Sequence, residues 1–253
     1  MPQDEIFNKP TVRQVIFEAR YPSLFFLESK IGELQLSLMR DFPTAELLFQ
    51  QQLLFAHLGS DVRASESPPP NSTRPTEKIW RFQNQAKTIT VNVQVSRLDV
   101  ISTVHKTYRN SGSDQKFRDV LDRVVNAFLS LTALPRFQRL GLRYIDDCPL
   151  PDKSTHTFNE YYDAAYPAGR FSIEDTKAYD FIAVVHKEGV SLRYAESLAD
   201  DNGKPKFTLD FDGFAENIEA SKWLSITDRL HEVISNEYFK TIKEPVKAYM
   251  RNH

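Results

Sequence analysis

Arginines in the middle of predicted strands are the residues whose type and place could bind a ligand. Arg143 and Arg193 occur in matching Leu-Arg-Tyr triplets at 142–144 and 192–194, and Arg20 precedes Tyr21 in a fainter third case. A guanidinium held in a strand presents a planar fork of donors that fits a carboxylate or a phosphate. If the two halves of the chain are related by internal symmetry, Arg143 and Arg193 would meet near the axis and form an anion site. Arg20 is a further candidate for binding the same anionic, nucleotide-like molecule.

The same arginines have a second interpretation, as members of internal ion pairs. For Arg143 and Arg193 the possible partners are Asp146, Glu196 and Glu18, and partly buried arginines are usually paired inside the protein. Replacing Arg143 by Met would separate the two interpretations. Lower stability with unchanged binding would favour the ion pair, whereas lost binding would favour the ligand site.

Two carboxylates, Asp210 and Asp212, alternate along one predicted strand and therefore share a face. Paired carboxylates could hold Mg²⁺ or Ca²⁺, or they could divide the roles of acid and base between them. The alternative is that both are solvated acids on the wet face of an edge strand. We adopt this second interpretation and predict no metal site here.

Motifs that mark common catalytic sites are missing from the sequence. It contains no G-x-x-x-x-G-K-[ST], G-x-G-x-x-G, H-E-x-x-H or G-x-S-x-G pattern. The six histidines are not at metal-ligand spacing on any predicted element, and no histidine is placed beside Cys148 to activate its thiol. We therefore expect no catalytic residue, no metal site and no cofactor, and enzymatic activity stays an open alternative.

Composition narrows the classes of protein that remain. The 253 residues include 32 Lys and Arg against 34 Asp and Glu, a formal net charge of −2. This balance argues against a strongly electrostatic nucleic-acid binder, although a local basic patch stays open. One cysteine, no signal-peptide pattern and no apolar run of about 20 residues predict a soluble cytoplasmic protein that has no membrane partner.

Hydrophobic periodicity predicts the elements that must position these side chains. Apolar residues recur at helical spacing over 114–131 and 225–243, and less strongly over 24–40 and 155–166. Strand patterns cover 11–21, 46–57, 78–83, 88–95, 99–105, 139–146, 179–186, 190–196 and 206–212. Because strands occur in clusters, we predict an α+β fold with a largely antiparallel sheet packed against the two long amphipathic helices.

The domain organisation is predicted to be a single domain over 1–253. The recurring Leu-Arg-Tyr triplets suggest two pseudo-related halves, 1–150 and 151–253, although strand propensity alone also favours such pairs. Residues 60–77 contain four prolines and few large apolar side chains. We interpret this segment as a mobile insertion because it cannot bury enough surface to offset its ordering entropy.

Three segments resemble an uncharacterised, sporadically distributed prokaryotic family. KPTVRQVIFEARYP at 9–22 is similar to its entry strand with F-E-I-R-[FY]-P, and RLGLRYID at 139–146 is similar to its central L-G-L-R-Y-I-N motif. LHEVISNEYFKTIKEPVKAYM at 230–250 is similar to its closing helix. Gln14 and Asp146 differ from the family, which usually has an acid and an asparagine there. The patchy distribution implies an accessory or mobile-element role, with phage defence as one setting.

These observations predict a non-catalytic interaction or accessory protein that binds a protein partner or a second copy of itself. The prediction depends on the missing catalytic motifs and on 18 Phe and 10 Tyr residues, more aromatic surface than a core requires. One alternative is an enzyme or sensor that binds an anionic ligand through Arg20, Arg143 and Arg193. The other is a nucleic-acid accessory protein, whose binding would weaken steeply with added salt.

Overall fold

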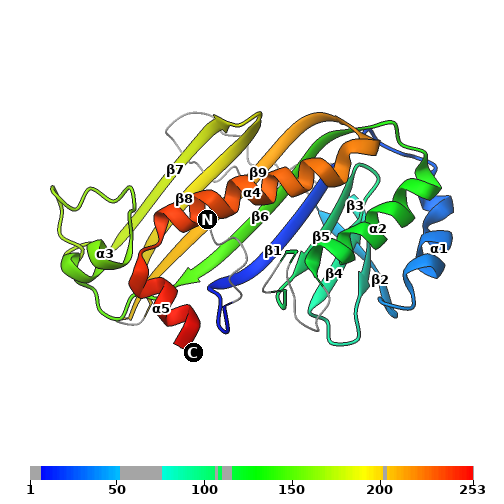
Figure 1. Ribbon diagram of the computed structural model, residues 1–253. Coiled ribbons are helices and arrows are strands. Elements are labelled where there is room, and N and C mark those ends of the chain that lie inside the picture. The colour runs from blue at the N-terminus through cyan, green and yellow to red at the C-terminus, as the bar shows by residue number, and fades with distance from the viewer. Residues whose placement is uncertain (1–6, 52–75, 106–107, 110–115, 202–203, 253) are drawn as a thin grey trace, which may run out of the picture.

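A computed structural model describes residues 7–51, 76–105, 108–109, 116–201 and 204–252. Within these residues, nine strands form one sheet in the order β2-β3-β4-β5-β1-β6-β9-β8-β7, accompanied by five α-helices (Figure 1). Every neighbouring pair of strands is antiparallel. The predicted α+β fold with an antiparallel sheet is confirmed.

The strands differ in length, from five residues in β4 to sixteen in β9. They are β1 (Val12–Arg20), β2 (Thr44–Gln51), β3 (Thr76–Gln83), β4 (Ile89–Val93), β5 (Arg97–Ser102), β6 (Arg136–Cys148), β7 (Ala178–Lys187), β8 (Val190–Asp201) and β9 (Lys204–Glu219). The helices are α1 (Leu27–Leu38), α2 (Phe117–Thr132), α3 (Thr155–Tyr161), α4 (Trp223–Thr241) and α5 (Glu244–Asn252), with a 3₁₀ turn η1 (Ala220–Lys222) before α4. None of the helices in the described ranges is both long and apolar enough to cross a lipid bilayer.

The chain passes twice through the same order of elements: a strand, a helix, a meander and a second helix. β1 is followed by α1, by the meander β2–β5 that ends beside β1, and then by α2. β6 is followed by α3, by the meander β7–β9 that ends beside β6, and then by α4. The antiparallel pair β1–β6 at the centre is the arrangement that a twofold axis normal to the sheet would produce. The division into halves at residue 150 stays a prediction.

One face of the sheet is covered by helices and holds the core. Figure 1 shows α2 and α4 over the same face, and α4 lies along β6, β8 and β9. The ring centroids of Phe17 in β1 and Trp223 in α4 are 6.1 Å apart, and those of Tyr21 and Phe128 in α2 are 4.9 Å apart. The strand residues on this face join the apolar stripes of the helices in one buried cluster, which hydrophobic burial stabilises.

The strand that carries Asp210 and Asp212 is not an edge strand, so that prediction was wrong. β9 lies between β6 and β8 in the sheet and extends well beyond the predicted 206–212. Alternation in the sequence gives the face on which a side chain lies, but it does not give the position of the strand in the sheet. The two carboxylates therefore have neighbours on both sides.

The boundary between α4 and α5 follows from local chemistry. α4 ends at Thr241, and α5 begins at Glu244 with Pro245 in its first turn, where a helix needs no backbone N–H donor. The predicted insertion at 60–77 lies outside the described residues except for 76–77, which begin β3.

Described residues near the two ends of the chain are joined by hydrogen bonds. The backbone N–H of Lys9 donates to the carbonyl of Met250 at 3.0 Å, and the side-chain amide of Asn8 donates to the carbonyl of Arg251 at 2.9 Å. The segment before β1 therefore lies against α5.

Candidate functional site

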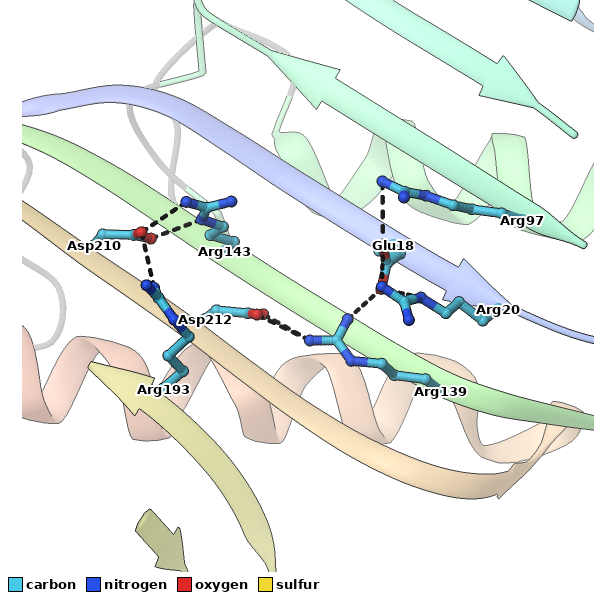
Figure 2. A network of polar contacts seen from close by, with 8 residues as sticks. All are labelled: Glu18, Arg20, Arg97, Arg139, Arg143, Arg193, Asp210 and Asp212. Atoms are coloured by element: carbon cyan, nitrogen blue, oxygen red, sulfur yellow. Dashed lines mark hydrogen bonds and ion pairs between the residues drawn. The ribbon is translucent and has the colours of Figure 1, made fainter. Parts of the chain in front are cut away.

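The sheet face opposite the helices carries a set of charged side chains, which we call the open-face network. Figure 2 shows most of it above the strands, with the helices behind. Strand alternation accounts for this placement, because neighbours of the buried residues point to the other face. The network spans five adjacent strands and consists of Arg97 and Asp99 in β5, Glu18 and Arg20 in β1, Arg139 and Arg143 in β6, Asp210 and Asp212 in β9, and Arg193 in β8.

Arg143 and Arg193, two of the predicted ligand-binding residues, meet on one carboxylate. Both arginines are in register with Asp212 between them, and their guanidiniums reach Asp210 two residues away. Arg143 donates to the two oxygens of Asp210 at 2.7 Å each, and Arg193 donates to Oδ2 at 3.1 Å (Figure 2). The paired fork geometry is the strong form of an arginine–carboxylate contact.

Arg20, the third predicted residue, belongs to a second cluster around Glu18. Arg20 binds Glu18 with Nε at 2.9 Å and NH2 at 3.1 Å, and Arg97 approaches the same carboxylate at 3.2 Å. Arg139 donates to Glu18 and also to Asp212, at 2.9 and 3.1 Å (Figure 2). The three predicted arginines therefore share a face but do not converge on one point.

Two of the acids suggested as partners lie on the wrong face. Asp146 is three residues from Arg143 along β6, and Glu196 is three residues from Arg193 along β8, so each pair points to opposite faces. Asp146 and Glu196 are 5% and 1% exposed on the helix-covered side. Of the suggested acids, only Glu18 joins the network, as the partner of Arg20.

The carboxylates of the network lie deeper than the guanidiniums that bind them. The side chain of Asp210 is 15% exposed and that of Arg143 is 41% exposed. The side chains of Glu18 and Arg20 are 11% and 52% exposed. With five arginines and four carboxylates, the network presents cations to the solvent over anions near the backbone. This layering is a consequence of the longer arginine side chain, which carries its charge farther from the backbone than an aspartate or glutamate does.

Burial and charge compete over the acids of the network. Burial, the largest influence on Glu18, would raise its pKa, but Arg20, Arg139 and Arg97 together outweigh burial and hold the pKa below its usual value. For Asp99 and Asp212 burial prevails over the neighbouring guanidiniums and the pKa is raised. Glu18 is therefore the acid whose charge the network stabilises most clearly.

Sequence reasoning missed Arg139, Arg97 and Asp99. A signal was present for Arg139, because it precedes Arg143 by four residues in β6 and therefore shares its face. Gly141 lies between them, and a Cβ there would collide with the guanidinium of Arg139. The glycine of the L-G-L-R-Y segment thus leaves room for Arg139 to cross toward Glu18.

The helix-covered side holds an acid without an arginine partner in the described contacts. Asp146 accepts a hydrogen bond from the Thr11 hydroxyl at 2.8 Å, and burial raises its pKa to about 7. The thiol of Cys148 lies nearby and is 7% exposed, and burial holds its pKa well above the usual value. A thiol that resists ionisation is a poor nucleophile.

A half-buried histidine, His231, lies on the helix-covered side between α4 and the residues before α2. The His231 ring in α4 stacks on Tyr108 at 4.4 Å, and its Nδ1 lies 3.1 Å from the Tyr144 hydroxyl. Burial, with a further contribution from Arg109, lowers its pKa to about 4. The hydroxyl of Tyr108 donates to Asp228 at 2.9 Å, so this cluster connects α4 to the segment before α2.

Within the described part of the chain, no three His, Cys, Asp or Glu side chains are grouped so that they could bind a metal ion. A shallow cavity of about 540 Å³ lies beside the start of β7 and is lined by Tyr166, Phe171 and Tyr179 among others. Comparisons with models of protein families, with curated proteins and with solved structures find no match for the chain. The resemblance to the sporadically distributed family therefore stays a prediction.

Proposed function

We propose that the chain is a non-catalytic interaction protein that binds a partner protein through the open face of its sheet. The observation that carries this proposal is the open-face network. Its guanidiniums stand outward across five strands, on a face that no described helix covers. Arginines are enriched at protein interfaces because their planar donors and apolar stems serve several kinds of contact at once.

The pairing of the network favours a binding surface over a catalytic centre. Asp210 is held by two guanidiniums and Glu18 by three. The guanidiniums around Glu18 hold its pKa below the usual value, which makes this carboxylate a weak proton acceptor. The arginines retain free edges for a partner, because one guanidinium carries five N–H donors. The partner surface that fits best is acidic, since the outermost groups are cations.

The test compares open-face variants with a control from the helix side. The double variant R143Q/R193Q removes two guanidiniums of the network, while R40Q removes an exposed arginine just after α1. Partner proteins captured with the wild-type chain are identified, and the direct affinity of each purified partner is measured for all three proteins. We expect the double variant to bind at least ~10-fold more weakly and R40Q to bind as the wild type does. Equal binding by the double variant and the wild type would refute the proposal.

A second candidate function is the sensing of an anionic, nucleotide-like ligand. It is favoured by the convergence of Arg143 and Arg193 on Asp210, because a phosphate could displace this single carboxylate from two guanidiniums. Titration with ATP and with inorganic pyrophosphate decides it. Saturable binding that R143Q/R193Q abolishes would replace the protein-partner proposal by this one. Binding of DNA or RNA that falls steeply with added salt would instead identify a nucleic-acid accessory protein.

The cytoplasmic location and the accessory role in phage defence are part of the same proposal. They derive from the single cysteine and from the family resemblance. Expression of the chain in a bacterial host, followed by phage plating, tests the role. A reduced plaque count for the wild type, but not for R143Q/R193Q, is the expected result, and equal counts with and without the protein would contradict it.

A further inference from the structure

The outer edge of β7 exposes apolar side chains beside an open row of backbone groups. β7 is the terminal strand of the described sheet and has ten residues. Ile182 and Val184 on the open face are 59% and 62% exposed, and Val185 on the helix side is 45% exposed. Long edge strands without proline are ready templates for another strand, and proteins usually shorten or protect them.

A second copy of the same strand can complete this edge. A twofold axis normal to the sheet would place two β7 strands antiparallel and keep the helices of both copies on one side of the joined sheet. Residues that lie directly opposite each other in an antiparallel pair point to the same face of the sheet. The axis must therefore lie midway between the two copies of one residue, and that residue defines the register. This condition leaves few registers to compare.

The register centred on Ala183 pairs the open-face side chains between Asp180 and His186. Asp180 of one copy lies opposite His186 of the other, and Ile182 lies opposite Val184. An acid thus faces a basic ring, and the two most exposed aliphatic residues of the strand face each other. Directly opposed pairs of this kind are the units that stabilise a sheet.

The same register matches the helix-side residues. Phe181 lies opposite Val185 of the second copy, which would cover the part of Val185 that is exposed in one chain. Shifting the centre to Val184 would carry Asp180 beyond the end of β7 at Lys187, so it would lose its basic partner. Shifting it to Ile182 would place Asp180 opposite an aliphatic side chain. The sequence of β7 is therefore self-complementary in one register only among these three.

We propose that the outer edge of β7 binds β7 of a second copy of this chain, antiparallel and in the register centred on Ala183. This interface lies at the edge of the sheet and does not use the arginines of the open-face network, so it can be tested separately from the proposed function. Two nine-stranded sheets would then form one continuous sheet.

The opposite edge of the sheet supplies a matched control. β2 also exposes large apolar side chains, because Leu47 and Phe49 are 47% and 63% exposed. Among its described side chains, Thr44–Phe49, Glu46 is the charged one. A β2 pair therefore offers this acid no base in any register. Both edges are comparably apolar, and only β7 has the complementary charge pattern.

The first test is the oligomeric state in solution. Light scattering with size-exclusion chromatography and sedimentation at micromolar concentration should find a dimer for the wild type and for F49K. We expect V184K to be a monomer, with dimer dissociation at least ~10-fold more favourable than in the wild type. A monomeric wild type, or a V184K variant that dimerises as well as the wild type, would overturn the proposal. Circular dichroism checks that each variant is folded.

The second test addresses the register. D180K places two bases opposite each other and H186D places two acids opposite each other, so each should weaken the dimer, and D180K/H186D should restore it. A183C should form a disulfide between copies under mild oxidation, since the paired Cα atoms of such a strand pair are about 5 Å apart. I182C should cross-link far more slowly because its opposite residue is Val184. Failure of the double variant to restore the dimer, or equal cross-linking of both cysteine variants, would refute the register.

Discussion

Glu18 and Asp146 lie on the neighbouring strands β1 and β6, but on opposite faces of the sheet and in opposite electrostatic surroundings. Both are buried, with 8% and 5% of their surface exposed. Glu18 is bound by three arginines and its pKa is lowered, whereas Asp146 is bound by the hydroxyl of Thr11 and its pKa is raised to about 7. The difference shows that burial alone does not decide the charge of an acid in this sheet, because neighbouring cations can reverse its effect.

The largest effect is expected from the apolar neighbour of Glu18. Phe17 is fully buried on the helix side and its ring meets Trp223. We expect Phe17→Ala to lower the free energy of unfolding by about 4 kcal/mol, because it leaves a cavity in the core. Urea unfolding at neutral pH measures it. A loss no larger than that for a network residue would remove the energetic distinction between the two faces.

The second largest effect on stability is expected from substitution of Asp146, and it should depend on pH. Its folded-state pKa of about 7 lies above the usual value of 3.8, so the folded state binds the proton more tightly. The contribution of Asp146 to the free energy of unfolding is therefore fully present below its usual pKa of 3.8 and is lost as the pH rises through 7. We expect Asp146→Asn to raise stability at pH 8.5 by about 3 kcal/mol and to change it little at pH 4. An Asn variant with the same gain at both pH values would contradict this account.

Glu18→Gln should give the opposite pH dependence. The folded-state pKa of Glu18 is depressed, so its contribution is present above the usual pKa of a glutamate and is lost as the pH falls through the folded value. At pH 7 the substitution leaves three guanidiniums without their shared carboxylate, and we expect a loss of about 2 kcal/mol. Unfolding curves at pH 7 and pH 3 test this, since the loss should shrink at the lower pH.

Arg143→Met should have the smallest effect on stability. The side chain is 41% exposed, and Asp210 keeps Arg193 as a partner. Solvent screening limits such pairs, so we expect a loss of about 1 kcal/mol or less. Thermal unfolding of this variant beside Arg193→Met measures the two contributions. A loss as large as that of Phe17→Ala would show that the network is part of the core.

Much of the sheet could be predicted from the sequence because alternation directly reports on faces. The phase of β6 already placed Arg143 opposite in face to Leu142, and it also placed Asp146 on the side of Leu142. The neighbours of each strand could not be predicted. Glu18 and Arg139 are 121 residues apart in the chain, and no local pattern relates them. The shared partner of Arg143 and Arg193 depended on the strand order, because Asp210 belongs to a strand that the sequence predicts at the edge and that lies inside the sheet.

The hydrogen bond between the segment before β1 and α5 indicates that the chain would tolerate circular permutation. Residues 9 and 250 share a backbone hydrogen bond, so a short peptide linker could join residues near the two ends. New ends could then be opened at residues 133–135, where α2 gives way to β6. Such a circular permutant would begin with the second round of strand, helix and meander and finish with the first. It should fold to the same sheet, because β1 and β6 would still meet as neighbours.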